Sequence, residues 1–174
     1  MSLFVDTIAT PIGALRIVWE DDTLRALDFG DDDEKFARLL EWQFGTAGLP
    51  HAQAPREIRQ AFEQYFAGDL TAIDRIKVNA IGTPFQQQVW AALREIPAGT
   101  TTSYGKLAER LGRPGASRAV GLANGSNPVG VVVPCHRVIG ANGSLTGYGG
   151  GLDRKRWLLE HERAGLLALS ESRK

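Results

Sequence analysis

The 174-residue sequence contains a single cysteine, Cys135, and only three histidines. One thiol cannot form an internal disulfide, and it cannot supply the cysteine pairs of a structural zinc site. The chain has no apolar run long enough to cross a membrane and no basic segment ahead of an apolar one at its start, so we expect neither a membrane span nor a signal peptide. A cytoplasmic location is expected, because a free thiol is best preserved in a reducing compartment.

The chain also lacks net charge, with 20 basic and 20 acidic residues. This balance hides an asymmetry, because residues 1–80 hold 8 Lys or Arg against 14 Asp or Glu, whereas residues 81–174 hold 12 against 6. The net charges of the two halves are therefore −6 and +6. We expect an acidic domain that does not touch nucleic acid and a basic domain that can neutralise phosphates, with an ordinary solvated surface as the alternative explanation.

The first eighty residues predict an antiparallel sheet with helices. Alternating or β-branched runs at 3–8, 14–19 and 24–29, separated by turn residues, predict three antiparallel strands. Helical spacing then predicts helices at 34–44 and 55–66, with four aromatic residues expected in the core: Trp42, Phe44, Tyr65 and Phe66. The stretch 79–83 is the expected linker, so we expect a structural domain at 1–80 and a second domain at 81–174.

The second domain begins with a clear helix start. Thr83 is the expected N-cap, with Pro84 at the first helical position and Gln86 placed to complete a capping box. Two shorter helical patterns follow at 104–111 and 116–124, separated by a Gly- and Pro-containing turn. This spacing is typical of a helix-turn-helix unit, although such units also occur as plain packing elements. The predicted fold class is therefore α+β, with an N-terminal antiparallel sheet and a helical C-terminal domain that carries the helix-turn-helix.

Cys135 lies in an apolar run interrupted by a base and a cation. Pro134 precedes it, and His136 and Arg137 follow it. These neighbours favour a thiol of lowered pKa and raised reactivity, against the alternative of an inert buried cysteine. We expect the segment to be extended, so that the side chains of Cys135 and His136 point to opposite faces and a water molecule must relay the proton between them.

Several motifs around this cysteine resemble those of the O6-alkylguanine-DNA alkyltransferases of the bacterial type. In chain order they are Thr83-Pro84-Phe85-Gln86, Ser103-Tyr104-Gly105, Ser117-Arg118-Ala119-Val120-Gly121, Asn127-Pro128-Val129, Pro134-Cys135-His136-Arg137-Val138, Gly147-Tyr148-Gly149-Gly150-Gly151 and Trp157-Leu158-Leu159-Glu160-His161-Glu162. The resemblance runs from about residue 82 to residue 163. Residues 1–80 carry no motif of that strength, although their strand-rich pattern is similar to the variable N-terminal domain of the family.

The resemblance implies a DNA-repair methyltransferase that acts once. It would transfer an alkyl group, such as methyl, from O6-alkylguanine in DNA to Cys135, with O4-alkylthymine as a second possible substrate. The implied partner is double-stranded DNA that contains O6-alkylguanine and is contacted in the minor groove, with the damaged nucleotide extruded from the stack. We expect a monomer without cofactor or metal, cytoplasmic and associated with the nucleoid when bound to DNA.

The resemblance also implies roles for residues beside Cys135. His136 would act as the base through water, with Glu162 orienting it in the manner of a catalytic triad. Tyr104 would donate a hydrogen bond to purine N3 as charge develops on the leaving guanine. Asn127 would brace the recognition helix and the cysteine loop.

The substrate and DNA contacts implied by the resemblance lie on both sides of the cysteine. The carbonyl oxygens of Cys135 and Val138 would accept hydrogen bonds from the exocyclic amine of the guanine, and a backbone N–H in the Tyr148-Gly149 turn would donate one to O6. Tyr148 would form an apolar wall against the base and its alkyl group. Arg118 would replace the extruded base in the stack. The expected DNA-binding residues are Ser117, Arg118, Ala119, Gly121, Leu122, Ala123 and Asn124.

The chain departs from the family pattern at two positions near the site. Some relatives have a bulky apolar residue in place of Asn124 and a serine in place of Gly149. His51 and His161 match no acid–base role in the family.

Two other functions compete with this prediction. A non-enzymatic lesion-binding module is one alternative, but relatives of that kind have tryptophan in place of the cysteine. A thiol hydrolase or peroxidase is another, but it leaves Arg118 and the small-residue helix unexplained.

Overall fold

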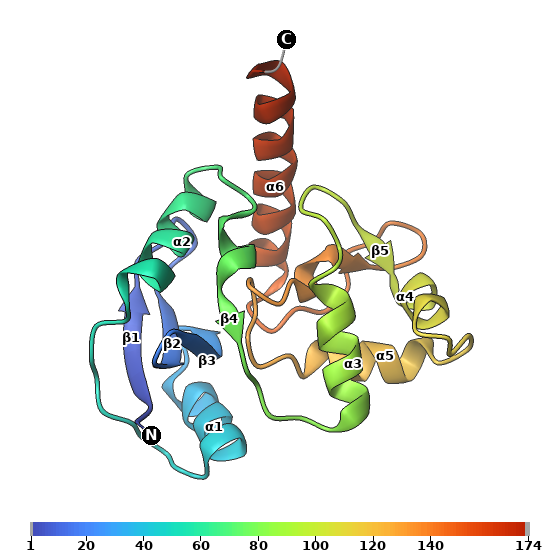
Figure 1. The fold of residues 1–174 in the computed structure, drawn as a ribbon. Helices are drawn as coiled ribbons and strands as arrows, with labels where there is room; N and C mark the ends of the chain where they lie inside the picture. Colours follow the sequence, from blue (N-terminus) through green and yellow to red (C-terminus); the bar gives the residue numbers. More distant parts are fainter. Residues whose placement is uncertain (1, 173–174) are drawn as a thin grey trace. The chain divides into compact units, whose positions relative to one another are not determined.

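The computed structural model describes residues 2–172, and side chains through residue 167. The chain divides into two compact units, residues 1–81 and 82–174, and the boundary lies within the stretch 79–83. The first unit contains the sheet, and the second is mainly helical (Figure 1). The α+β fold class predicted from the sequence is confirmed.

The first unit is built on a four-stranded sheet in the order β1-β2-β3-β4. Strands β1 (Phe4–Ile8), β2 (Leu15–Glu20) and β3 (Thr23–Phe29) are antiparallel, and β4 (Lys77–Val78) pairs with β3 in parallel. Helices α1 (Asp33–Phe44) and α2 (Arg56–Phe66) and the short 3-10 helix η1 (Ala72–Arg75) lie between β3 and β4 in sequence. The three antiparallel strands and both helices agree with the prediction within two residues at each end, whereas the two-residue β4 was not predicted.

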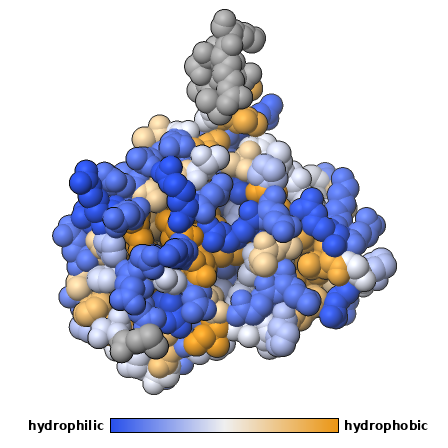
Figure 2. All heavy atoms as spheres, viewed as in Figure 1, coloured by the Kyte–Doolittle hydropathy of each residue, from blue (hydrophilic) through white to orange (hydrophobic). Residues whose placement is uncertain are grey.

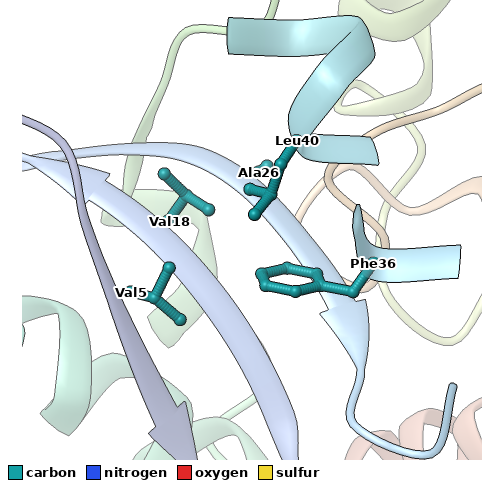
Figure 3. Close-up of a cluster of buried hydrophobic side chains, with 5 residues drawn as sticks. All are labelled: Val5, Val18, Ala26, Phe36 and Leu40. Carbon is teal, nitrogen blue, oxygen red and sulfur yellow. The ribbon is translucent and has the colours of Figure 1, made fainter. Parts of the chain in front are cut away.

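The strand register explains how α1 packs on the sheet. Val5 pairs with Val18, and Val18 pairs with Ala26, so the three side chains form one row across the sheet. Phe36 and Leu40 of α1 pack onto this row, and all five side chains are buried (Figure 3). The spacing of four residues puts Phe36 and Leu40 on the same helix face.

One aromatic residue predicted in the core lies outside it. Trp42 is 45% exposed, because it follows Leu40 by two residues and therefore points away from the buried face of α1. Tyr65 is fully buried as predicted, while Phe44 and Phe66 are partly buried. Figure 2 shows mostly hydrophilic side chains on the face that it presents, with small apolar patches between them.

The second unit contains four α-helices and a small parallel sheet within its described residues. The helices are α3 (Pro84–Leu93), α4 (Tyr104–Arg110), α5 (Ser117–Gly125) and α6 (Leu152–Ser172). Strands β5 (Thr102–Ser103) and β6 (Val138–Ile139) pair in parallel, and the 3-10 helix η2 (Cys135–Arg137) leads directly into β6. None of the helices in residues 2–172 is long and apolar enough to cross a membrane.

The capping box predicted at the start of α3 is present. The Thr83 side chain accepts a hydrogen bond from the backbone N–H of Gln86, and the Gln86 side chain accepts one from the backbone N–H of Thr83. Helix α3 then holds α5 through two side chains: Trp90 Nε1 donates to the carbonyl of Ala123 at 2.9 Å, and Gln86 Nε2 donates to Ser126 Oγ at 3.1 Å. These bonds fix which face of α5 is buried.

Candidate active site

The segment around Cys135 is a tight turn rather than the extended strand predicted from the sequence. The backbone N–H of Cys135 donates to Val133 O at 2.8 Å, and that of Arg137 donates to Pro134 O at 3.0 Å, which closes the 3-10 helix η2. Pro134 fixes the chain at φ −82° ahead of the turn. The alternation of side chains expected for a strand therefore does not apply to Cys135 and His136.

Asn127 braces the loop that leads to the cysteine. Its Nδ2 donates to Val133 O at 2.8 Å, and its Oδ1 accepts from the backbone N–H of Val129 at 3.0 Å. Within this loop the buried Val131 has φ 71°, a conformation that a β-branched residue rarely adopts and that costs of order 1–3 kcal/mol. The side-chain bonds of Asn127 help to hold this strained backbone four residues before the thiol.

The side chain of Cys135 is buried, and only 8% of the residue is exposed. Burial raises the pKa of its thiol, while a hydrogen bond from Asn127 and the positive charge of Lys155 act to lower it. Burial outweighs the other two, so the net direction is upward. The lowered thiol pKa predicted from the sequence is therefore wrong for this state of the protein, because the neighbouring cation and hydrogen bond do not offset the loss of hydration.

His136, Arg137 and Glu162 form a buried charged cluster behind the cysteine. His136 Nε2 lies 2.8 Å from Glu162 Oε2, and Arg137 binds both carboxylate oxygens of Glu162, with Nε at 2.9 Å and Nη2 at 2.8 Å. Arg137 Nη1 also donates to Ile96 O at 2.6 Å. Burial acts to raise the pKa of Glu162, but the attraction of His136 and Arg137 outweighs it and holds that pKa far below its usual range.

The other ring nitrogen of His136, Nδ1, is buried and has no hydrogen-bond partner within the described protein residues. Since Nε2 faces the carboxylate, Nδ1 is the position at which this histidine can exchange a proton with another group. The cluster therefore fixes both the orientation of the imidazole and the nitrogen available for chemistry.

Lys155 is a second buried cation near the thiol. It is fully buried on α6, and its Nζ donates to Val138 O at 2.8 Å and to Thr146 O at 3.0 Å. Burial lowers the pKa of its ammonium group. Both hydrogen bonds tie the loop that follows β6 to the strand that follows Cys135.

A pocket of about 320 Å³ lies next to these groups. Its lining residues are Tyr104, Gly121, Asn124, Gly125, Gly147, Tyr148 and Gly149. Asn124 connects it to the cysteine, because its Nδ2 lies 3.5 Å from Cys135 O. The glycines leave room at the walls while the two tyrosines supply apolar faces, which is a composition suited to a flat aromatic ligand.

The exposed and buried faces of α5 divide its predicted DNA-binding residues. Ser117, Arg118, Ala119 and Leu122 are exposed, and Leu122 is 73% exposed. Gly121 is partly buried, and a Cβ atom there would meet the ring of Tyr104 at 3.6 Å. The structure does not place Ala123 and Asn124 on the exposed face: both are 4% exposed, Ala123 on the side that α3 contacts and Asn124 on the side that contacts Cys135 O.

The structure thus brings the expected residues together in two groups. The first, around the pocket and the charged cluster, contains Tyr104, Asn127, Cys135, His136, Val138, Tyr148, Gly149 and Glu162. The second is the exposed face of α5. His161 stacks on Trp157 with ring centroids 4.7 Å apart, and His51 bridges to Val5 in the first unit. No group of three or more metal-ligating side chains occurs among the residues that the structure describes.

Sequence reasoning missed Lys155 as part of the site, and it named Arg137 only as a cation beside the thiol, not as the partner of Glu162. A pattern that could have revealed Lys155 is the stripe Lys155, Leu158 and Glu162 on α6, which all share one helix face. Charged residues that lie on the same helix face as a buried leucine are candidates for burial. Thr146 was also missed, because it lies in an irregular loop where no period applies.

Two family models cover nearly the whole chain. Residues 84–164 match the DNA-binding domain of 6-O-methylguanine DNA methyltransferase, and residues 3–80 match the ribonuclease-like domain of the same family. A methylated-DNA–protein-cysteine methyltransferase of Shigella flexneri is 48% identical over 165 residues, which is 93% of this chain and 96% of the relative. A protein of the same name from Mycolicibacterium paratuberculosis is 49% identical over 160 residues, or 90% of each chain.

Solved structures agree with the sequence relatives. The O6-methylguanine methyltransferase of Mycobacterium tuberculosis superposes with a TM-score of 0.80 at 43% identity, covering 93% of both chains. The M. tuberculosis OGT in complex with DNA also gives a TM-score of 0.80 at 43% identity, covering 95% of this chain and 94% of that one.

Proposed function

Because the chain belongs to the 6-O-methylguanine DNA methyltransferase family, we propose that it repairs DNA by moving an alkyl group from guanine O6 to its own cysteine. The acceptor is Cys135. The observation that carries this proposal is the place of the chain's sole thiol. Asn124, which lines the aromatic pocket, contacts the carbonyl oxygen of Cys135, and the next residue, His136, is bonded to Glu162.

The reaction is a single displacement at the alkyl carbon. The thiolate of Cys135 forms the new S–C bond as the C–O6 bond breaks, and the bonding electron pair stays on guanine O6. The guanine then takes up one proton at a ring nitrogen, and the thiol has given up one, so charge and atoms balance. A hydrogen-bond donor that stabilises the charge developing on the purine lowers the barrier.

His136 takes the proton from the thiol through a bridging water. Its Nε2 faces Glu162, which leaves Nδ1 as the proton-accepting atom. Arg137 and Glu162 hold the ring so that Nδ1 keeps its direction during the reaction. Since burial raises the pKa of the Cys135 thiol, removal of its proton by His136 is a necessary part of the reaction.

The flipped base is held by the walls of the pocket. Tyr104 donates to purine N3, and Tyr148 covers the ring and the alkyl group. The backbone N–H of Gly149 donates to O6. The carbonyl of Val138 accepts from the exocyclic amine with its second lone pair, because its first already accepts from Lys155.

Helix α5 enters the minor groove of the damaged duplex. Its exposed face is made of Ser117, Ala119 and other small residues, which permit close approach, and Leu122 adds an apolar contact with the sugars. Arg118 extends from the start of this face and fills the gap left by the extruded nucleotide. Together with the turn at 111–116, α4 and α5 act as a helix-turn-helix unit.

The partner is double-stranded DNA that contains O6-alkylguanine, and the protein acts as a monomer in the cytoplasm. The surplus of positive charge in residues 81–174 supports this role, because neutralising phosphates supplies most of the sequence-independent affinity for DNA. Binding should weaken steeply as the salt concentration rises.

Incubation with a duplex containing O6-methylguanine tests the proposal. We expect the mass of the protein to increase by one methyl group, with the added mass on the peptide that contains Cys135. The Cys135→Ala variant should gain no mass but should bind the duplex nearly as well as the wild type, since phosphate and groove contacts set the affinity. Wild-type protein that gains no methyl would overturn the proposal, and loss of DNA binding in the variant would refute separate binding and chemical roles.

A further inference from the structure

Thr146 contacts one wall of the candidate pocket and the buried Lys155. Its Oγ1 lies 2.5 Å from the hydroxyl oxygen of Tyr104, 42 residues away in sequence, and its backbone oxygen accepts from Lys155 Nζ at 3.0 Å. Tyr104 and Tyr148 line the pocket, whereas Thr146 is partly buried and is not among the residues that line it. The threonine therefore touches the tyrosine that we expect to donate to the purine.

Proton counting sets the direction of the bond between the two hydroxyl groups. A tyrosine hydroxyl has one proton and can accept through its oxygen. If Tyr104 donates that proton to purine N3, the bond to Thr146 persists only when Thr146 is the donor. If Tyr104 instead donates to Thr146, it has no proton left for the substrate.

We propose that Thr146 is a positioning residue for Tyr104: it donates its hydroxyl proton to the tyrosine oxygen and thereby directs the tyrosine proton into the pocket. This inference rests on the function proposed above. A hydroxyl that accepts a hydrogen bond is also a stronger donor, because successive hydrogen bonds polarise one another. Thr146 thus both aims the tyrosine proton and assists its donation to the leaving guanine.

Lys155 holds the threonine in the place that this role requires. Its ammonium group bonds Val138 O at 2.8 Å as well as Thr146 O, so the loop of Thr146 is fixed relative to the strand that follows Cys135. Val138 begins β6, three residues after the thiol. The Tyr104 hydroxyl is therefore positioned against the backbone that carries the nucleophile.

Single-turnover methyl transfer to Cys135 tests this role in four variants. Thr146→Val removes the hydroxyl but keeps a branched side chain, and Thr146→Ser keeps the hydroxyl. Tyr104→Phe removes the proposed donor. Thr100→Val is the matched control, because the Thr100 hydroxyl only donates to Pro97 O in an exposed turn at 2.7 Å. Thermal melts establish that each variant is folded.

We expect Thr146→Val to slow transfer about three- to tenfold, which is the effect of one net hydrogen bond. Thr146→Ser and Thr100→Val should stay within about twofold of the wild type. In the Tyr104→Phe background, Thr146→Val should have no further effect, because the two residues act through one proton.

A substrate without the acceptor atom separates positioning from a structural role. In 3-deaza-O6-methylguanine a carbon replaces N3, so neither hydroxyl can assist. The wild type should react more slowly with this base, and Thr146→Val should then react at the wild-type rate. Equal slowing by Thr146→Val on both substrates, additive effects with Tyr104→Phe, or no effect at all would overturn the role of Thr146. If the wild type transfers no methyl from either substrate, the proposed function itself fails.

Discussion

The chemistry of single residues in the site is governed by burial. The pKa of the Cys135 thiol is raised because the thiolate would lose its hydration, and Lys155 opposes this by supplying a positive charge nearby. Lys155 is itself buried, and the proximity of a thiolate favours its charged form. Formation of the thiolate and retention of the charge on Lys155 are therefore coupled.

Replacing Lys155 by methionine should move the pH dependence of thiol alkylation upward. The positive charge lowers the pKa of Cys135, so its removal leaves burial less opposed and the thiolate forms only at higher pH. The rate of reaction with a haloacetamide, measured against pH, reports this directly because the chain has one cysteine. Arg156→Met removes an exposed charge from the same helix and should leave the profile in place. An unchanged profile for Lys155→Met would show that its charge does not reach the thiol.

Glu162 should make the folded protein sensitive to acid. Its folded pKa lies below its unfolded value of 4.5, so its contribution to stability is complete above pH 4.5 and is lost as the pH falls below that value. In Glu162→Gln this loss should be absent, so stability should vary less with pH in that window. At neutral pH the variant should be about 3–5 kcal/mol less stable, because Arg137 is left buried without a carboxylate.

Urea unfolding at a series of pH values measures both effects of the Glu162 substitution. Glu160→Gln is the control, since Glu160 is exposed on the same helix and its replacement should change stability by less than about 0.5 kcal/mol. A Glu162→Gln variant with the same acid sensitivity as the wild type would mean that other carboxylates dominate acid unfolding.

At the scale of elements, the helices with local start signals were predictable and the turns around the thiol were not. The capping box at Thr83 and the apolar spacing of α3 are short-range features, so the sequence predicts them directly. The 3-10 helix at Cys135 depends instead on tertiary contacts, including the Asn127 bond to Val133 O and the bonds of Arg137. Sequence motifs indicated the nucleophile, its base and the neighbouring Arg137, but the pairing of Arg137 with Glu162 and the burial of Lys155 could be seen only in the fold.

Helix α5 has a mostly apolar buried side that includes one polar residue, Asn124, and an exposed side of mostly small residues. Asn124 is held inside by its contact with Cys135 O, so it cannot serve as an apolar wedge in the stack. Arg118 and Leu122 are four residues apart on the exposed face and are therefore neighbours along the helix. The long side chains available to DNA on this helix are thus one cation and one aliphatic group.

Arg118→Ala should slow repair of duplex DNA far more than repair of single strands. Extruding a base from a duplex costs a few kcal/mol, and in its proposed role the arginine would offset part of that cost by filling the gap. We expect a loss of about 10- to 100-fold on duplex and little change on a single strand, measured as methyl transferred at saturating DNA. Arg163→Ala, which removes an exposed charge on α6, should affect both substrates alike. Equal slowing of both by Arg118→Ala would remove this residue from the flipping step.

The two units of the molecule differ in net charge, and the candidate active site lies in the positively charged one. The six excess negative charges of residues 1–80 lie in the unit with the sheet, while the six excess positive charges belong to residues 81–174, which also hold the thiol and the pocket. The charge asymmetry was predictable because it needs only counting. In the first unit the antiparallel strands were predictable. Strand β4 was not, because its two residues pair with β3, which is far away in the sequence.

Each molecule should act once and should be less stable afterwards. A thioether at Cys135 can be cleaved only by a strong nucleophile or a redox group, and the sequence contains no cofactor-binding motif, so transfer should stop at one methyl per chain. The methyl must fit at a site where only 8% of the cysteine is exposed, and overpacking of this kind typically costs about 1–3 kcal/mol. Titration against excess methylated duplex, with thermal melts before and after, measures both effects, and Cys135→Ala treated in the same way controls for bound DNA. More than one methyl per chain would refute the single-use mechanism, and an unchanged melting temperature would refute the loss of stability.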